Sequence, residues 1–182
     1  MAVFNFYNVE TCHGASLQIK IFIILSFSLL VSCGGGQNGE SFKTDYGTLA
    51  LRRICDTVNV IEHFNGDSII SQWELRFPVY RFDYGDLNGN GVNEIVVGVT
   101  KKTRYWEEGN RLFIYKLYNG RLIRPLWLGS RLGGDILDFH VNRSTKPAQI
   151  ITTEDFKDSI VTAVYSLGGF GLRFEGVLGV IY

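Results

Sequence analysis

Cysteine, proline, methionine and long apolar runs are all scarce in this chain of 182 residues. Of its three cysteines, Cys12 and Cys33 precede the part of the sequence with regular strand patterning, which excludes a disulfide bond within that part. Its fold must therefore be stabilised by a hydrophobic core, and Cys55 is expected to be a small buried side chain. The longest apolar run, Ile21 to Val31, is shorter than the roughly twenty residues that a membrane-spanning helix needs.

A basic excess is absent as well. The chain has 18 Lys plus Arg and 18 Asp plus Glu, so its formal net charge is zero. Proteins that bind nucleic acid concentrate positive charge to contact phosphates. Arg121, Arg124 and Arg131 are spaced along predicted strands, where arginines usually form a solvated face. Nucleic acid is therefore not expected as a partner.

Motifs of enzyme chemistry are also missing. His13, His63 and His140 have no metal-ligand spacing, and no G-x-S-x-G nucleophile turn occurs. Asp135 and Asp138, or Glu107 and Glu108, could be read as an acid and base pair, but carboxylates at strand ends and turns are usually solvated. The sequence favours a protein that is not an enzyme. The alternative that stays open is a glycan-active hydrolase or an accessory subunit of one.

One loop, from Asp86 to Glu94, carries a specific chemistry. Oxygen-bearing groups recur at alternate positions, and Gly91 supplies a sharp turn. Calcium takes six to eight oxygen ligands, which a short curled loop can supply. The candidate ligands are Asp86, Asn88, Asn90, the carbonyl of Val92, and Glu94. With two carboxylates, the site predicts weak, structural calcium binding; the alternative is a glycine- and asparagine-rich turn that holds no ion.

The loop lies between two predicted strands, so it differs from a helix-loop-helix calcium site. The pattern D-x-N-x-N-G-x-x-E followed by Ile95-Val96-Val97-Gly98-Val99 resembles the loop of FG-GAP or VCBS-type repeats. The resemblance implies β-propeller blades, as in the integrin α-chain head, and calcium bound through Asp86, Asn88, Asn90 and Glu94. Asparagines stand here where those families commonly have aspartates.

An internal repeat predicts the architecture. Phe64-Asn65-Gly66 and Tyr118-Asn119-Gly120 each lead to a tryptophan, at Trp73 and Trp127, and a weaker third copy covers Leu167 to Phe174. Helical periodicity is lacking, so we expect an all-β fold of about three four-stranded, blade-like antiparallel repeats. Because propellers usually have four to eight blades, three would form an open, propeller-like stack, associate with another copy, or build a β-sandwich.

The central unit is expected to contain the strands Glu94 to Thr100, Arg111 to Tyr118, Arg121 to Leu128 and Asp135 to Val141. The calcium loop should recur one unit later. At the matching ligand positions stand Val141, Arg143, Thr145 and Gln149, so that copy has lost its ion site and Pro147 fixes the turn instead.

The N-terminal region predicts where the protein is located. The run from Ile21 to Val31 suits a signal peptide, and Leu30-Val31-Ser32-Cys33 resembles the lipobox of bacterial lipoproteins. The resemblance implies a signal peptide over 1–32, lipidation of Cys33 and a flexible tether over 33–43, before a β-repeat domain over 44–182. Lys20 is the first basic residue, which is unusual for a signal peptide, and one explanation is an overlong start with translation beginning at Leu17.

These features predict a lipid-anchored, non-catalytic protein of the bacterial outer membrane or cell envelope, on the periplasmic or surface face. It would recognise an envelope protein or glycan, and open sheet edges would allow oligomers. Trp73 and Trp127 recur in the repeat and are assigned to packing. Tyr105 and Trp106 lie in a long loop and are the candidate ligand contacts.

Overall fold

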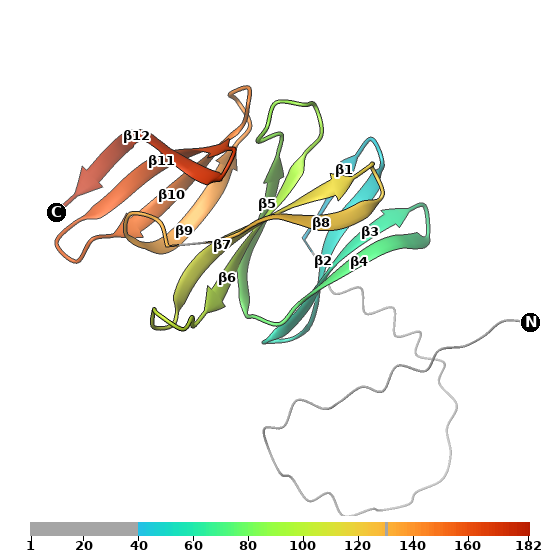
Figure 1. Cartoon of the computed structure of the whole chain (residues 1–182), viewed down its shortest axis with the longest axis horizontal. Helices are drawn as coiled ribbons and strands as arrows, with labels where there is room; N and C mark the ends of the chain where they lie inside the picture. The colour runs from blue at the N-terminus through green and yellow to red at the C-terminus, as the bar shows by residue number, and fades with distance from the viewer. Residues whose placement is uncertain (1–39, 130) are drawn as a thin grey trace, which may run out of the picture. The chain divides into compact units, whose positions relative to one another are not determined.

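The computed structural model describes residues 40–129 and 131–182, and every helix-or-strand element in those ranges is a β-strand (Figure 1). The strands form three four-stranded antiparallel sheets, which we call A, B and C. Sheet A contains β1 (Ser41–Thr44), β2 (Gly47–Cys55), β3 (Val58–Asn65) and β4 (Ser68–Leu75). Sheet B contains β5 (Val79–Gly85), β6 (Glu94–Lys101), β7 (Gly109–Tyr118) and β8 (Leu122–Leu128). Sheet C contains β9 (Asp135–Asn142), β10 (Gln149–Asp155), β11 (Ile160–Gly168) and β12 (Gly171–Ile181).

Within each sheet the strands are neighbours in chain order, joined by hairpins. The prediction of an all-β fold with three four-stranded antiparallel sheets in an open arrangement is confirmed. The four strands predicted for the central unit were wrong by one strand, because they correspond to β6 to β9 whereas sheet B contains β5 to β8. Asp135 to Val141 belongs to β9 and opens sheet C, and β5 opens sheet B. The reason is that the segment after β8 crosses to the next sheet instead of turning back along β8.

Sheet B is the middle layer because both of its faces are buried. On β6, Ile95 and Val97 belong to the core shared with sheet A, whereas Val96 belongs to the core shared with sheet C. The alternation on β7 is the same: Phe113 packs toward sheet A and Ile114 toward sheet C. Side chains of a strand point alternately to its two faces, so a continuous apolar run is what a doubly covered strand requires.

The outward face of sheet A is polar. Arg52 Nε donates to Glu62 Oε1 at 2.7 Å, and Gln72 Nε2 donates to the same oxygen at 3.1 Å. Glu62 is only 4% exposed because these two longer side chains on the neighbouring strands cover it. Because the Glu62 carboxylate is hydrogen-bonded by these neighbours, this face is stable without a fourth sheet to cover it.

Hydrogen bonds link sheet B to sheets A and C. Asp83 on β5 accepts hydrogen bonds from the Val141 amide at 2.7 Å and from Arg143 Nη1 at 2.6 Å, both in sheet C. On the other side, the His63 ring lies between the carbonyl oxygens of Tyr46, 2.9 Å from Nε2, and Arg121, 3.0 Å from Nδ1. The sheets are therefore fixed in register by hydrogen bonds as well as by apolar packing.

The folded unit begins earlier than expected. β1 covers Ser41–Thr44, which includes residues assigned to the tether. Phe42 is the cause, because its ring is buried and stacks on Tyr84 with 3.9 Å between ring centroids. Residues 38–182 form a contact unit that contains both hydrophobic cores. The signal-peptide and lipobox assignments, including Cys33, lie outside the described residues.

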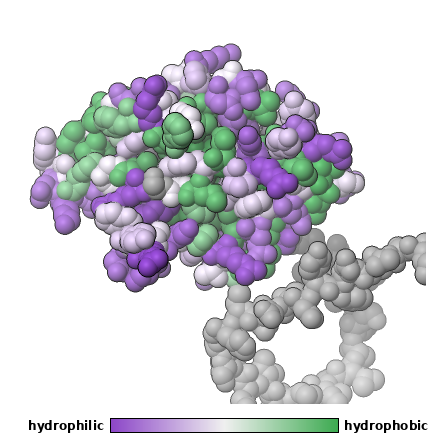
Figure 2. All heavy atoms as spheres, in the orientation of Figure 1, coloured by the Kyte–Doolittle hydropathy of each residue, from purple (hydrophilic) through white to green (hydrophobic). Residues whose placement is uncertain are grey.

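No helix in the described part of the chain is long and apolar enough to cross a membrane. Apolar side chains do reach the surface (Figure 2). On β12 they include Phe174, Leu178 and Ile181, and the turn before it exposes Phe170 completely. Sheet C therefore presents aromatic and aliphatic groups to solvent.

Candidate functional site

The loop between β5 and β6 is anchored at both ends. Leu87 is 1% exposed and packs in the core between sheets B and C. The carbonyl of Asp86 accepts a hydrogen bond from the Ala148 amide of sheet C at 2.8 Å. These contacts fix the loop over residues 86–93 at one end of sheet B, beside the corresponding β9–β10 hairpin.

Side-chain oxygens of this loop point back at its own backbone. Asp86 Oδ1 accepts from the Gly89 and Asn90 amides, and Asp86 Oδ2 accepts from the Gly91 amide at 2.9 Å. Asn90 Oδ1 accepts from the Val92 amide at 2.8 Å. Gly89 and Gly91 have φ values of 77° and 84°, which favour glycine. The predicted ligands are thus gathered inside one curl of chain.

Glu94 closes the loop from the first position of β6 and is 2% exposed. Its carboxylate accepts from the Leu87 amide at 2.9 Å and from Asn88 Nδ2 at 2.5 Å. Burial raises the pKa of Glu94 from 4.5 to about 7, and the nearby Asp86 charge adds to the rise although amide hydrogen bonds oppose it. An ionised Glu94 here lacks a compensating positive charge.

This donor set fits a hard cation. Two carboxylates, two amide oxygens and one backbone carbonyl are oxygen ligands of the kind that calcium takes. Asp86 Oδ2 and Asn90 Oδ1 each accept one hydrogen bond and keep a second lone pair for a cation, whereas Asp86 Oδ1 already accepts two. A divalent ion would also neutralise the Asp86 and Glu94 charges. In the described ranges no cluster of three or more His, Cys, Asp or Glu could hold a metal, so a cation would depend on amide and backbone oxygens.

The equivalent hairpin of sheet C contains no such curl. Asn142 Oδ1 accepts from Ser144, and Arg143 is turned toward sheet B, where its guanidinium lies 4.5 Å from the centroid of the Tyr84 ring. Pro147 lies in the turn, as the sequence predicted. A cation here would meet the Arg143 charge, so the oxygen curl occurs in sheet B and not in its sheet C counterpart.

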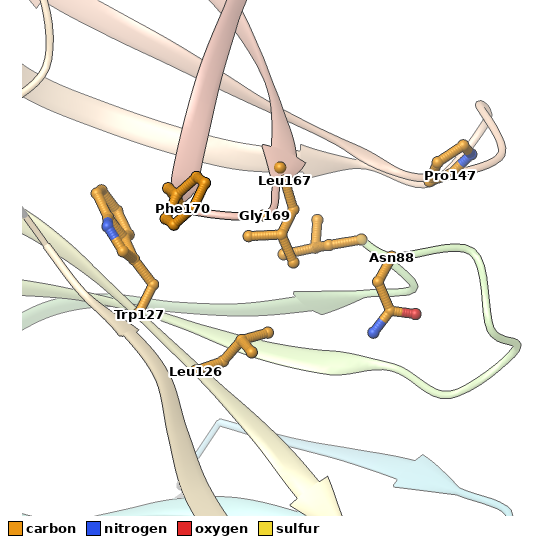
Figure 3. Close-up of a pocket in the computed structure, with 10 residues that line it drawn as sticks. Asn88, Leu126, Trp127, Pro147, Leu167, Gly169 and Phe170 are labelled. Atoms are coloured by element: carbon orange, nitrogen blue, oxygen red, sulfur yellow. The ribbon is translucent and has the colours of Figure 1, made fainter.

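A cavity of about 480 Å³ adjoins the loop (Figure 3). Asn88 and Pro147 lie toward one end, and Trp127 and Phe170 lie toward the other. Phe170 is fully exposed at the tip of the β11–β12 hairpin, because three neighbouring glycines give its ring nothing to pack against. Trp127 is half-buried, and a Cβ at Gly171 would lie 2.5 Å from its Nε1. The close approach of the hairpin to the indole therefore fixes the Trp127 side chain at this rim, while the Phe170 ring projects from the hairpin tip into solvent.

Comparisons with protein-family models, with curated proteins and with solved structures find no match for this chain. The resemblance of the loop to FG-GAP and VCBS-type repeats stays a prediction.

Tyr105 and Trp106 are exposed, as expected, but lie away from the loop. They follow β6, whereas the loop precedes it, and eight residues of strand span roughly 25 Å. The Arg131 guanidinium lies 4.8 Å from the centroid of the Trp106 ring, and Arg104 lies 5.6 Å from that of Tyr105. The structure does not bring these two aromatic residues together with the predicted calcium ligands.

Sequence reasoning missed Phe170 and gave Trp127 a packing role alone. Trp127 does pack against the core between sheets B and C, yet it also lines the cavity. The signal for Phe170 was present in Gly168-Gly169-Phe170-Gly171, because an aromatic ring inside a glycine turn is exposed by necessity. Trp73 has the predicted packing role, with its ring 5.7 Å from that of Tyr115.

Proposed function

We propose that this chain is a non-catalytic β-repeat recognition module of the bacterial cell envelope, anchored through a lipid on Cys33. Its loop over residues 86–94 binds a structural calcium ion through Asp86, Asn88, Asn90, Val92 and Glu94. The ion would rigidify the loop and neutralise its carboxylates. The module binds an envelope protein or a glycan.

The observation that carries the recognition role is the cavity between the loop and the Phe170 hairpin. A fully exposed phenylalanine and a half-buried tryptophan at one rim offer apolar aromatic surface to a ligand. Asn88 adds an amide at the other end and links the cavity to the calcium loop. Binding sites of this size are typically apolar with a few polar groups that orient the ligand.

Aromatic rings of this kind can stack on a sugar ring or pack against apolar side chains, so the test has two arms. The unit over residues 38–182 is applied to a glycan array and, separately, used for crosslinking capture from envelope extract. Binding in one arm identifies the ligand class. Phe170→Ser should abolish that binding without changing the melting temperature, because Phe170 supports no packing.

The control is Ile69→Ser, which replaces an apolar residue of sheet A that is also exposed, at 49%, but does not line the cavity. It should bind as the unsubstituted protein does. Full binding by Phe170→Ser would show that the cavity is not the site. Absence of binding in both arms would contradict the recognition function.

A further inference from the structure

A second cavity, of about 500 Å³, shares Trp127 with the first and is otherwise lined mostly by residues of sheet C. Its lining differs in chemistry from that of the first, because it includes a carboxylate and four aromatic side chains. The residues that matter are Trp127, Arg131, Glu154, Phe156, Tyr165 and Phe174. The first cavity is lined by no charged residue.

Glu154 lies on β10 and has no exposed surface. Its Oε1 accepts from Thr152 Oγ1 and its Oε2 from the Gly134 amide, both at 2.6 Å, and the Tyr165 hydroxyl is a third partner. All three donors are neutral. Within the residues that the structure describes, no basic nitrogen lies within 4.0 Å of this carboxylate. A buried carboxylate without a countercharge is costly.

Arg131 lines the same cavity but is engaged elsewhere. Its guanidinium pairs with Asp135 at 3.2 Å and lies 4.8 Å from the centroid of the Trp106 ring. The Arg131 guanidinium is therefore directed toward the β6–β7 loop and the first residue of β9. The positive charge that would balance Glu154 is not supplied by this side chain.

Aromatic rings form the walls around Glu154. Tyr165 and Phe174 meet edge to face with centroids 5.8 Å apart. Phe156 lies across the backbone of Gly133 and Gly134, where a Cβ at Gly134 would come within 2.8 Å of its ring. Phe156 is 43% exposed and Phe174 is 56% exposed, so the rings are reachable from solvent. Faces of aromatic rings attract cations, and desolvation strengthens that attraction.

We propose that this cavity binds an organic ammonium group, with Trp127, Phe156, Tyr165 and Phe174 as an aromatic cage and Glu154 as the buried countercharge. The ammonium would be the quaternary group of a lipid headgroup, which has no N–H to donate, because the Glu154 oxygens already accept hydrogen bonds from neutral donors. The cage explains why aromatic surface on sheet C stays exposed beside a buried carboxylate. The site is separate from the first cavity and needs neither calcium nor the lipid anchor.

The test compares choline with 3,3-dimethyl-1-butanol, a neutral molecule of the same shape, by calorimetric titration of residues 38–182. Choline should bind at least about tenfold more tightly than the alcohol, because the alcohol forgoes both the cation–π attraction and the Glu154 charge. Glu154→Gln should reduce that preference to about two- to fivefold, because the charge is lost while the aromatic rings still attract the cation. Phe174→Leu should weaken choline binding about two- to fivefold.

Glu175→Gln is the matched control, because Glu175 is a carboxylate of the same sheet that does not line the cavity. It should leave the preference unchanged. Phosphatidylcholine vesicles and N-acetyl-lysine methylamide, titrated in parallel, distinguish a lipid source from a protein source. Equal affinity for choline and the alcohol, no binding of choline, or a preference that is undiminished in both Glu154→Gln and Phe174→Leu would overturn the proposal.

Discussion

At the scale of single residues, Glu94 makes the stability of the proposed calcium loop depend on pH. Its pKa in the folded protein, about 7, lies above its ordinary value of 4.5, so folding favours the protonated form. Without calcium, the contribution of Glu94 to the free energy of unfolding should therefore be fully present below pH 4.5 and be lost as pH rises through about 7. The loss is at most about 3 kcal/mol. Urea unfolding in EDTA between pH 4.5 and 7.5 measures it.

Glu94→Gln is the control for that titration. The amide does not ionise, so this variant should lose the decline in stability across the same pH range. Calcium added at pH 7 should stabilise the unsubstituted protein and do less for the variant, because one ligand charge is gone. An equal decline in both proteins would show that another group controls the pH dependence.

Gly98 on β6 is required by the Tyr80 ring. A Cβ at Gly98 would lie 2.4 Å from Tyr80 Cζ, so Gly98→Ala must displace a ring packed against the core between sheets B and C. We expect a loss of about 1–3 kcal/mol in the free energy of unfolding. Gly176→Ala on β12 should change it by less than about 0.5 kcal/mol, because nothing lies within 4 Å of that position. Similar losses in both variants would contradict this packing argument.

Turn and loop residues were well predicted from the sequence where the backbone conformation favours particular residue types. The Asn119-Gly120 pair has φ values of 52° and 65°, as a tight hairpin turn with two positive φ angles requires. The inward oxygens of Asp86 and Asn90 also follow from alternation and glycine placement. Glu154 could not be predicted, because only the pairing of β10 with β9 and β11 reveals that its carboxylate is buried.

At the scale of elements, Asp83 holds sheets B and C together. Asp83→Ala would remove the partner of the Val141 amide, which is buried, and of Arg143. A buried donor left unsatisfied costs about 1–3 kcal/mol, and we expect a destabilisation of that size in urea unfolding. Asp67→Ala, in the exposed β3–β4 turn, is the control and should be nearly neutral. A neutral Asp83→Ala would mean that apolar packing alone docks the two sheets.

Strand positions were easier to predict than strand partners. The run Ile95-Val96-Val97 indicated a buried strand, and β6 is covered on both faces. The sheet to which β9 belongs was not predictable from hydrophobic pattern, because a hairpin and a crossover can follow the same glycine-containing segment. β1 was missed because a single residue, Phe42, supplies its burial.

At the scale of the whole molecule, the two cores share sheet B, so the three sheets should unfold together. Thermal melts of residues 38–182 followed by Trp fluorescence and by far-UV circular dichroism should coincide. Trp73 reports the core with sheet A and Trp127 the core with sheet C. Separate transitions would show that the sheets are energetically independent and would weaken the description of one stacked unit.

The proposed lipid anchor also concerns the whole chain. Cys33→Ser should move the full-length protein from the membrane fraction to the soluble fraction of a bacterial host, because it removes the thiol that we propose to be acylated. Cys55→Ser is the matched control and should stay with the membrane. A soluble unsubstituted protein would contradict lipid anchoring.

The central claim, a calcium-stapled loop on a stack of β-repeats, is tested most directly by one melting experiment on residues 38–182. Calcium at roughly ten times a submillimolar Kd should raise Tm over its value in EDTA by about 3–5 °C. Asp86→Ala should abolish that shift. An identical Tm for the unsubstituted protein in EDTA and in millimolar calcium would contradict the account.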